Sequence, residues 1–318
     1  MSSCAEPGLI SVTEAIDTLV SSVKSVPASE SVPLDAAMGR VLSESVHSPV
    51  NVPPWNNSAM DGYALKFQDL ASQPLPVSQR IAAGVAPAPL QPGTAARIFT
   101  GAPVPDGADT VVMQEDTEIL DEGKVSFIQG IKAGANIREA GEDITIGQQV
   151  VSRGSVLRGQ DLGLIASVGV PAVEVYRPLK VALLFSGDEL LQPGDAPEPG
   201  KIYNSNRYML AAMMQEQGYN VCYQVNVPDT LGATVMALRE AASLADVVVT
   251  TGGVSVGEED HLKPAVEQLG RLNLWKIDIK PGKPFAFGQL QTARNDLPQV
   301  PFIGLPGNPV SVFSTFLI

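Results

Sequence analysis

The pattern that most constrains the fold is an alternation of short apolar runs with helical patterns, which begins near residue 179. Because neighbouring parallel strands need a crossover connection, usually a helix, this alternation predicts a mostly parallel sheet with helices on both faces. We therefore expect an α/β domain over residues 179–318. The strand-like runs are residues 181–185, 221–225 and 246–249, and the helical patterns are residues 204–217 and 230–244.

The first half of the chain has a different character. Residues 11–24 form an amphipathic pattern that Ser11 or Thr13 can cap, which predicts a helix. Residues 54–145 consist of short apolar runs separated by glycine and proline turns, which predicts a β-rich segment. A stretch rich in proline and asparagine at residues 51–57 marks a boundary between the two.

The composition excludes several classes of protein. The chain of 318 residues carries a formal net charge of −13, which argues against nucleic acid or an anionic membrane as its main partner. Two cysteines and two histidines are too few for a disulfide framework, a zinc cluster or a histidine-based triad. The N-terminal residues lack the pattern of a secretory signal, and no apolar run approaches transmembrane length. We expect a cytoplasmic protein.

A glycine-rich turn at residues 250–260 directly follows the apolar run that ends at Val249. Glycine lets the backbone approach a ligand closely, and free N–H groups at the start of a following helix attract anions. The turn therefore fits a phosphate-binding corner, and it equally fits an ordinary connection between a strand and a helix. Its spacing matches neither the P-loop nor the dinucleotide-binding fingerprint.

Three further turns repeat this arrangement, at residues 186–189, 280–284 and 305–309. In open α/β sheets, ligands bind beyond the carboxyl ends of the strands, so several such turns carry more weight than one. Lysines beside the second turn can direct ammonium groups at an anion, or they can be solvated surface charge. The candidate ligand-binding residues are Ser186, Gly187, Asp188, Gly252, Gly253, Ser255, Gly257, Lys276, Lys280, Lys283, Pro306, Gly307, Asn308 and Pro309.

Carboxylates stand beside several of the predicted turns. Each has a structural explanation as well, because Asp-Gly is a favoured turn pair and Asp often caps helices. Thr100 adds a hydroxyl at the end of a predicted strand, where it can contact a ligand or make a local turn bond. The candidate catalytic residues are Asp61, Thr100, Asp143, Glu189, Asp229 and Asp260.

Two of these carboxylates are candidate ligands for a cation. Mg²⁺ prefers oxygen ligands and is usually held by one or two carboxylates together with substrate phosphates. Glu189 and Asp260 follow strand ends of the same predicted sheet. We expect them to hold a Mg²⁺ ion shared with a phosphorylated ligand.

Eight motifs follow one another in order along the chain. They are SAMDGYA (58–64), TGAPVP (100–105), GADTVV (107–112), REAGED (138–143), SGDEL (186–190), TGGVSVG (251–257), KPGKPFAFG (280–288) and LPGNPVS (305–311). Several long motifs in one order are far more specific than a single glycine loop. With these motifs the chain resembles the MoeA family of molybdopterin molybdenumtransferases, which includes the E domain of gephyrin.

The resemblance implies a multidomain organisation. An extended N-terminal domain would comprise residues 1–53 and 146–178, with a β-rich domain inserted at residues 54–145. Residues 179–318 would be the molybdopterin-binding α/β domain. The family also has a C-terminal β-barrel domain. Because the chain ends in an uncapped apolar helical pattern at residues 310–318, we expect that domain to be absent.

The resemblance also implies an activity, namely Mg²⁺-dependent insertion of molybdate into adenylylated molybdopterin with release of AMP. The family forms homodimers in which Asp61, Thr100 and Asp143 of one subunit would act with residues 189, 229 and 260 of the other. A molybdopterin adenylyltransferase would act upstream, and maturation factors of molybdoenzymes would act downstream. Whether molybdate or tungstate is the natural oxyanion stays open, as does the division of metal-binding and base roles among the carboxylates.

Two alternative functions have to be weighed against the transferase. The α/β domain and its glycine turn are shared with the enzyme of the preceding adenylylation step, but the motifs of the first half argue against that step. A gephyrin-like scaffold without catalysis is the other alternative. The functional carboxylates are intact, which a pure scaffold does not require.

Overall fold

The computed structural model describes residues 9–23, 27–128, 130–253, 261–281 and 284–318. Its contacts divide the chain into two compact units. Unit 1 comprises Met1–Glu30 and Tyr176–Ile318, and unit 2 comprises Ser31–Val175. The finer domain boundaries predicted above stay predictions. No helix in the described part has the length and apolarity needed to cross a membrane.

Unit 1 is built on a seven-stranded sheet with the order β1-β19-β20-β21-β18-β14-β17. Parallel pairs join β14 to β17, β14 to β18 and β18 to β21, which confirms the predicted mostly parallel sheet. Strand β20 is antiparallel to both of its neighbours, because the short connection from β19 leaves no room for a crossover. The strands are β1 (Leu9–Ile10), β14 (Lys180–Ser186), β17 (Asn220–Val227), β18 (Val247–Thr251), β19 (Gly270–Ile277), β20 (Pro284–Gln291) and β21 (Gln299–Leu305). A separate two-stranded ladder joins β15 (Leu190–Leu191) and β16 (Ile202–Tyr203).

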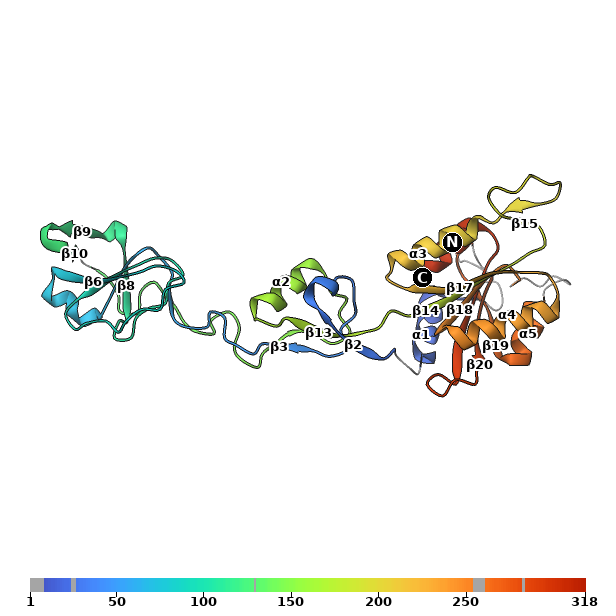
Figure 1. Cartoon of the computed structure of the whole chain (residues 1–318), viewed down its shortest axis with the longest axis horizontal. Helices are drawn as coiled ribbons and strands as arrows, with labels where there is room; N and C mark the ends of the chain where they lie inside the picture. Colours follow the sequence, from blue (N-terminus) through green and yellow to red (C-terminus); the bar gives the residue numbers. More distant parts are fainter. Residues whose placement is uncertain (1–8, 24–26, 129, 254–260, 282–283) are drawn as a thin grey trace, which may run out of the picture. The chain divides into compact units, whose positions relative to one another are not determined.

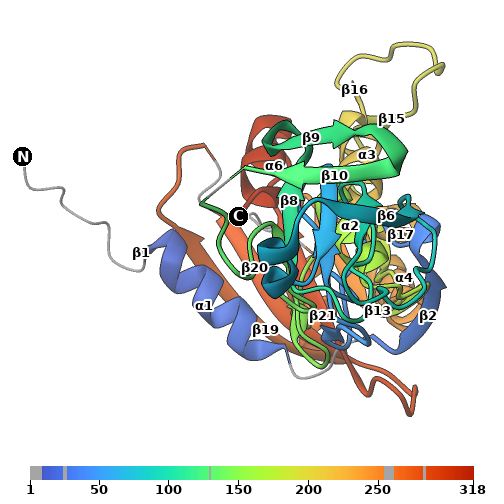
Figure 2. The same cartoon turned by 90° about the vertical axis from the view of Figure 1, so that its left-hand side faces the viewer.

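Helices cover both faces of this sheet. Side chains alternate along β14, so Ala182 and Leu184 pack with α4 and α5 while Leu183 and Phe185 pack with α1, α3 and α6. Figure 1 shows α4 and α5 on one face and α3 on the opposite face. Figure 2 shows α1 beside β19 at the edge of the sheet. The helices are α1 (Val12–Ser22), α3 (Ser205–Glu216), α4 (Leu231–Leu244), α5 (Leu262–Leu269) and α6 (Pro309–Phe316).

Side-chain caps fix where four of these helices begin. Of the two caps predicted for α1, Ser11 is the one that accepts a backbone N–H group. Asn204 and Thr230, the first residues of the helical patterns at 204–217 and 230–244, do the same for α3 and α4. Asn308 caps α6 by accepting from the N–H groups of Val310 and Ser311. Helices α4 and α6 each start four positions after the end of a parallel strand, so their N-termini face the carboxyl edge of the sheet.

Unit 2 is dominated by β-structure. Its six-stranded sheet has the order β8-β5-β7-β6-β10-β9, and its two faces bury separate apolar clusters. Along β5, Tyr63 and Leu65 enter one cluster and Ala64 enters the other, which gives the period of two expected of a strand. A third cluster, which includes Leu42, Leu157 and Ile165, packs around α2. The elements are β2 (Ser29–Pro33), β3 (Val46–His47), β4 (Asn57–Ser58), β5 (Gly62–Leu65), β6 (Leu75–Ile81), β7 (Ala95–Ile98), β8 (Thr110–Met113), η3 (Gln114–Asp116), β9 (Thr117–Leu120), β10 (Lys124–Phe127), β11 (Ile137–Arg138), β12 (Gln149–Val151), α2 (Gly159–Ser167) and β13 (Ala172–Tyr176).

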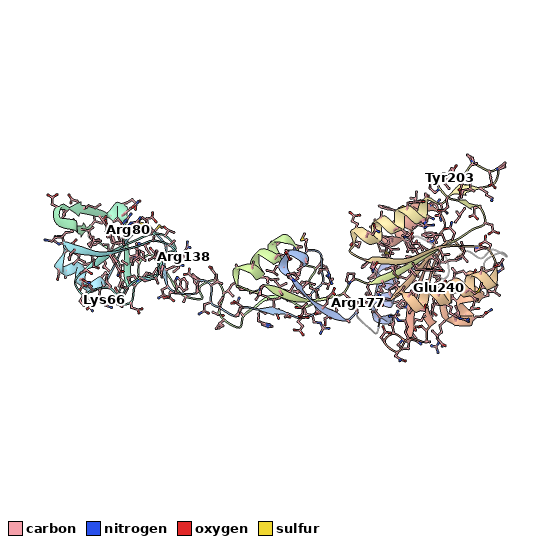
Figure 3. The ribbon with its side chains drawn as sticks, viewed as in Figure 1. Lys66, Arg80, Arg138, Arg177, Tyr203 and Glu240 are labelled. Carbon is pink, nitrogen blue, oxygen red and sulfur yellow. The ribbon has the colours of Figure 1, made fainter. Side chains whose placement is uncertain are left out.

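A buried ion pair ties the start of unit 1's central strands together. The carboxylate of Asp246, which is 6% exposed, accepts from both terminal nitrogens of Arg177 at 2.6 and 3.0 Å and from the Lys180 N–H at 2.9 Å. Arg177, which precedes β14 in the chain, is labelled in Figure 3. Burial by itself would raise the pKa of Asp246, but the Arg177 guanidinium and the Lys180 N–H outweigh burial and hold the pKa below its ordinary value.

Replacement of this carboxylate, Asp246→Asn, is expected to destabilise unit 1 by about 2–3 kcal/mol, because it leaves Arg177 without its buried counter-charge. The folded-state pKa of Asp246 is lowered, so the stabilisation is complete above the unfolded-state pKa of about 3.9 and is lost as the pH falls through the folded-state value. Urea unfolding at several pH values measures this difference. The matched control is Asp296→Asn, which removes an exposed carboxylate from Arg294 and should change stability little. Equal losses for the two variants would contradict the prediction.

Candidate functional site

The candidate site of unit 1 is the carboxyl edge of its sheet. Strands β20, β21, β18, β14 and β17 are consecutive neighbours, so the loops at this edge form one continuous row. Two contacts show the closeness of adjacent loops. The Gly252 N–H donates to the Leu305 carbonyl at 3.2 Å, and the Asp188 N–H donates to the Asp229 carboxylate at 3.0 Å.

Gly252 forms the tightest part of this row. Its φ of +85° is left-handed, and a Cβ there would lie 2.9 Å from the Ser186 carbonyl oxygen. A Cβ on Gly307, in the loop after β21, would lie 3.8 Å from the Cα of Gly252. Ser186, Gly252 and Gly307 are thus packed backbone to backbone, and a side chain at position 252 would push these loops apart.

Asn206 holds the Gly307 loop from the first turn of α3. Its Nδ2 donates to the Gly307 carbonyl at 2.7 Å, and the residue is 7% exposed. Its Oδ1 is buried and has no hydrogen-bond partner in the part of the chain that the structure describes. A buried acceptor without a partner lowers the stability of the fold by about 1–3 kcal/mol, which the hydrogen bond to Gly307 and the packing of Asn206 have to offset. Asn206 is not among the residues predicted from the sequence, because its only local signal is its place two residues after the helix cap Asn204.

Three predicted carboxylates lie at the β14–β17 end of the row. Asp188 and Asp229 are linked reciprocally, since each carboxylate accepts the backbone N–H of the other at 3.0 and 3.1 Å. The Glu189 carboxylate folds over Gly187, where a Cβ would collide with it. Glu189 forms no ion pair with any described residue. Its role as a ligand for a cation stays a prediction.

The predicted lysines lie at the opposite end of the row. Lys276 is the second-last residue of β19, where it pairs in register with Pro284, and Lys280 follows in the connection to β20. Both are exposed. The buried Pro306 and the exposed Gly307 and Asn308 lie between the lysines and the carboxylates, in the loop before α6.

Some predicted residues fall outside the described ranges. They are Ser255, Gly257, Asp260 and Lys283. Gly253, two residues after the end of β18, and Pro309, at the start of α6, are described. The predicted metal pair of Glu189 and Asp260 therefore stays a prediction. Within the described ranges, no group of three or more His, Cys, Asp or Glu side chains is placed to hold a metal ion.

Unit 2 brings together two of the predicted residues, Asp61 and Thr100. The Asp61 Oδ1 accepts from the Thr100 N–H at 2.8 Å and from the Thr100 hydroxyl at 2.7 Å. These two hydrogen bonds, the N–H first, hold the pKa of Asp61 below its ordinary value against partial desolvation, and the positive charge of Arg97 adds to the effect. The half-buried carboxylate is ionised and acts as an acceptor.

Asp143, the remaining predicted residue of unit 2, is exposed. Its backbone N–H donates to the Val52 carbonyl at 2.9 Å beside the bridge between Val52 and Ile144. Among the described residues it has no hydrogen bond or ion pair with Asp61 or Thr100. Its assignment to the same site stays a prediction.

Comparison with known proteins gives matches along almost the whole chain. The model for the MoeA N-terminal region (domain I and II) matches residues 10–169, and the model for a probable molybdopterin binding domain matches residues 182–318. The molybdopterin molybdenumtransferase of Haemophilus influenzae is 42% identical over 285 residues, which cover 89% of this chain and 69% of the relative. The chain belongs to the MoeA family. The resemblance indicated by the eight motifs is thereby confirmed.

Two further comparisons agree with membership of the MoeA family. The molybdopterin molybdenumtransferase of Nostoc sp. is 37% identical over 319 residues, which cover 98% of this chain and 72% of the relative. A crystal structure of the molybdopterin biosynthesis MoeA protein of Pyrococcus horikoshii matches with a TM-score of 0.82 and 31% identity, over 97% of this chain and 77% of that one. The row of loops in unit 1 thus lies in the segment that matches the molybdopterin-binding domain, and Asp61 and Thr100 lie in the MoeA N-terminal segment.

The variant Gly252→Ala tests the close packing of this MoeA-family site. We expect it to destabilise unit 1 by about 1–3 kcal/mol, because alanine is strained at a positive φ and its Cβ meets the Ser186 carbonyl. Thermal and urea unfolding measure the loss. Gly232→Ala in α4, where a Cβ meets nothing within 4 Å, is the control and should be neutral or stabilising. If both variants are as stable as the unaltered chain, position 252 tolerates a Cβ and the close packing does not depend on glycine.

Proposed function

We propose that this chain, a transferase of molybdenum cofactor biosynthesis, inserts molybdate into adenylylated molybdopterin with release of AMP. Family membership supports the pathway and the transferase class. The adenylylated substrate, the dependence on Mg²⁺ and the roles of individual residues are inferences from the site.

The observation that carries the proposal is the separation of charge along the carboxyl edge of unit 1. Lysines stand on the β19–β20 hairpin, carboxylates follow β14 and β17, and two glycine-containing loops lie between them. Three strand spacings separate β20 from β14, which amounts to about 14 Å. An elongated ligand with an anionic part at one end and a reacting group at the other suits this arrangement.

Each part of the edge has a defined task in this proposal. Lys276 and Lys280 attract the phosphate groups of the ligand as point charges. Gly252 and Gly307 let the backbone approach the ligand, because neither presents a side chain to it. The N-terminus of α6, capped by Asn308, adds a partial positive charge that favours an anion in the same loop.

Carboxylate oxygens, which Mg²⁺ prefers as ligands, stand at the β14–β17 end of this edge. Glu189 forms no ion pair with a described residue, and its chain neighbour Asp188 is linked to Asp229 by reciprocal hydrogen bonds. We assign Glu189 and Asp260 to the metal, with Asp188 or Asp229 supporting them. When bound, Mg²⁺ supplies neutralisation of phosphate charge and polarisation of the bond that is cleaved.

The Asp61–Thr100 pair supplies a second group of functional atoms. The ionised Asp61 carboxylate can orient water or accept a proton, and Thr100 holds it in one orientation through two hydrogen bonds. We assign Asp143 to the same reaction on the strength of its motif. We further propose that the chain acts as a homodimer in the cytoplasm, as the family resemblance implies.

AMP release from adenylylated molybdopterin is the decisive assay. With Mg²⁺ present, AMP should appear when molybdate is added and should not appear when sulfate replaces molybdate. Equal release with either oxyanion would contradict the transferase. Tight ligand binding without any AMP release would favour a scaffold role instead.

Two substitutions test the opposite ends of the edge. Glu189→Gln should lower Mg²⁺-dependent AMP release by on the order of 10²–10³-fold without unfolding the protein, because it removes an ionised oxygen ligand. Lys280→Gln should weaken ligand binding, and the loss should shrink as salt is raised. The matched controls are Glu216→Gln and Lys263→Gln, at exposed positions on α3 and α5. If Glu189→Gln behaves like Glu216→Gln, or Lys280→Gln like Lys263→Gln, the substituted end of the edge has no role in the reaction.

A further inference from the structure

Arg97, near the end of β7, occupies a central position beside the Asp61–Thr100 pair. Its Nη1 donates to the Gly62 carbonyl at 3.0 Å, and its Nη2 donates to the Gln114 Oε1 at 2.5 Å. The guanidinium also lies over two aromatic rings, 5.1 Å from the centroid of Tyr63 and 4.7 Å from that of Phe99. One half-buried side chain thus joins β5, β7 and η3.

These contacts fall on the backbone that carries the functional pair. Gly62 directly follows Asp61, and the backbone N–H of Gln114 donates to the Asp61 carbonyl at 3.0 Å. Phe99 directly precedes Thr100. Arg97 therefore contacts the chain neighbour of each member of the pair, Gly62 next to Asp61 and Phe99 next to Thr100. No described hydrogen bond joins Arg97 to the Asp61 carboxylate itself.

We propose that Arg97 is a positioning residue, which holds Asp61 and Thr100 in the one geometry where a carboxylate oxygen accepts both Thr100 donors. The inference rests on the role of the Asp61–Thr100 pair proposed above. Arginine is suited to this task because its planar guanidinium donates two divergent hydrogen bonds while it stacks on aromatic rings. A lysine ammonium can keep the charge but cannot reproduce that combination.

Arg80 on β6 provides an internal control. It pairs in register with Arg97, and its guanidinium lies 4.5 Å from the centroid of the same Phe99 ring. It is exposed and makes no hydrogen bond or ion pair within the described ranges; Figure 3 labels it. Arg80→Gln removes the same charge and a stacking contact, but none of the hydrogen bonds that define the proposed role.

Removal of Arg97 should also change the titration of Asp61. The charged groups on the surrounding elements are Arg97 on β7, Arg80 on β6, Glu115 and Asp116 on η3, and Arg138 on β11. The pKa of Asp61 is held low first by the Thr100 hydrogen bonds and then by Arg97. Loss of Arg97 weakens both effects, so the pKa should rise and the acidic limb of activity should move to higher pH.

The experiment compares Arg97→Gln, Arg97→Lys and Arg80→Gln with the unaltered chain. Carboxyl ¹³C NMR follows the Asp61 titration in the ligand-free protein, and the Thr100 amide resonance reports its hydrogen bond. AMP release gives kcat as a function of pH. Arg97→Gln should raise the Asp61 pKa, move the Thr100 resonance and lower kcat by on the order of tenfold with little change in KM. Arg97→Lys keeps the positive charge, so it should raise the Asp61 pKa less than Arg97→Gln does, but it should still move the Thr100 resonance. Arg80→Gln should leave the Asp61 pKa, the Thr100 resonance and kcat unchanged.

The two readouts separate this inference from the proposed function. An unchanged Asp61 pKa and Thr100 resonance in Arg97→Gln would overturn the positioning role, whatever the activity. Altered NMR signals with an unmoved pH profile would overturn its part in the reaction. If the chain releases no AMP at all, the proposed function fails while the NMR comparison still decides whether Arg97 positions the pair. If Arg97→Gln does not fold, Gln114→Leu removes the Nη2 acceptor, together with a 3.3 Å hydrogen bond to the neighbouring Glu115, and keeps Arg97 in place. It should move both NMR signals in the same direction by less.

Discussion

The parallel register of β14 with its two neighbours is the constraint on which the rest of unit 1 depends. Ser186 pairs with Val227 on one side, and Phe185 pairs with Thr251 on the other, so three strands end together. A slip of one residue would exchange Leu183 and Leu184 between the two helical layers, which the buried core does not allow. The packing that holds the core therefore also brings the Asp188–Asp229 pair and the Gly252 corner to one edge.

The parts of the fold that the sequence predicts are those with a local cause. Apolar runs mark the strands, and the caps Ser11, Asn204 and Thr230 mark where helices begin, because each acts within three residues of itself. The contact of Asn206 with Gly307 joins residues 101 positions apart and leaves no local pattern. Such contacts follow from the three-dimensional arrangement of strands and stay hidden in a single sequence.

The Asp61–Thr100 pair shows how far residue types alone carry the prediction of a site. Asp-Gly is a favoured turn pair and Thr often makes a local turn bond, so each residue has a sufficient structural explanation. The structure joins them across 39 positions, through two hydrogen bonds to one oxygen. Motif order indicated both residues, but the lowered pKa of Asp61 and the contribution of Arg97 to it required the geometry.

An acidic protein that binds an anionic ligand repels that ligand at long range through its net charge and has to attract it at short range through a few local cations. The net charge of −13 repels an approaching anion, while Lys276 and Lys280 attract it only at one end of the carboxyl edge. Salt screens both effects, over a Debye length of about 8–10 Å at ordinary ionic strength. Added salt can therefore leave the affinity of the unaltered chain nearly constant even when the lysines matter. The difference between a lysine variant and its matched control isolates the local attraction, because the long-range repulsion changes equally in both.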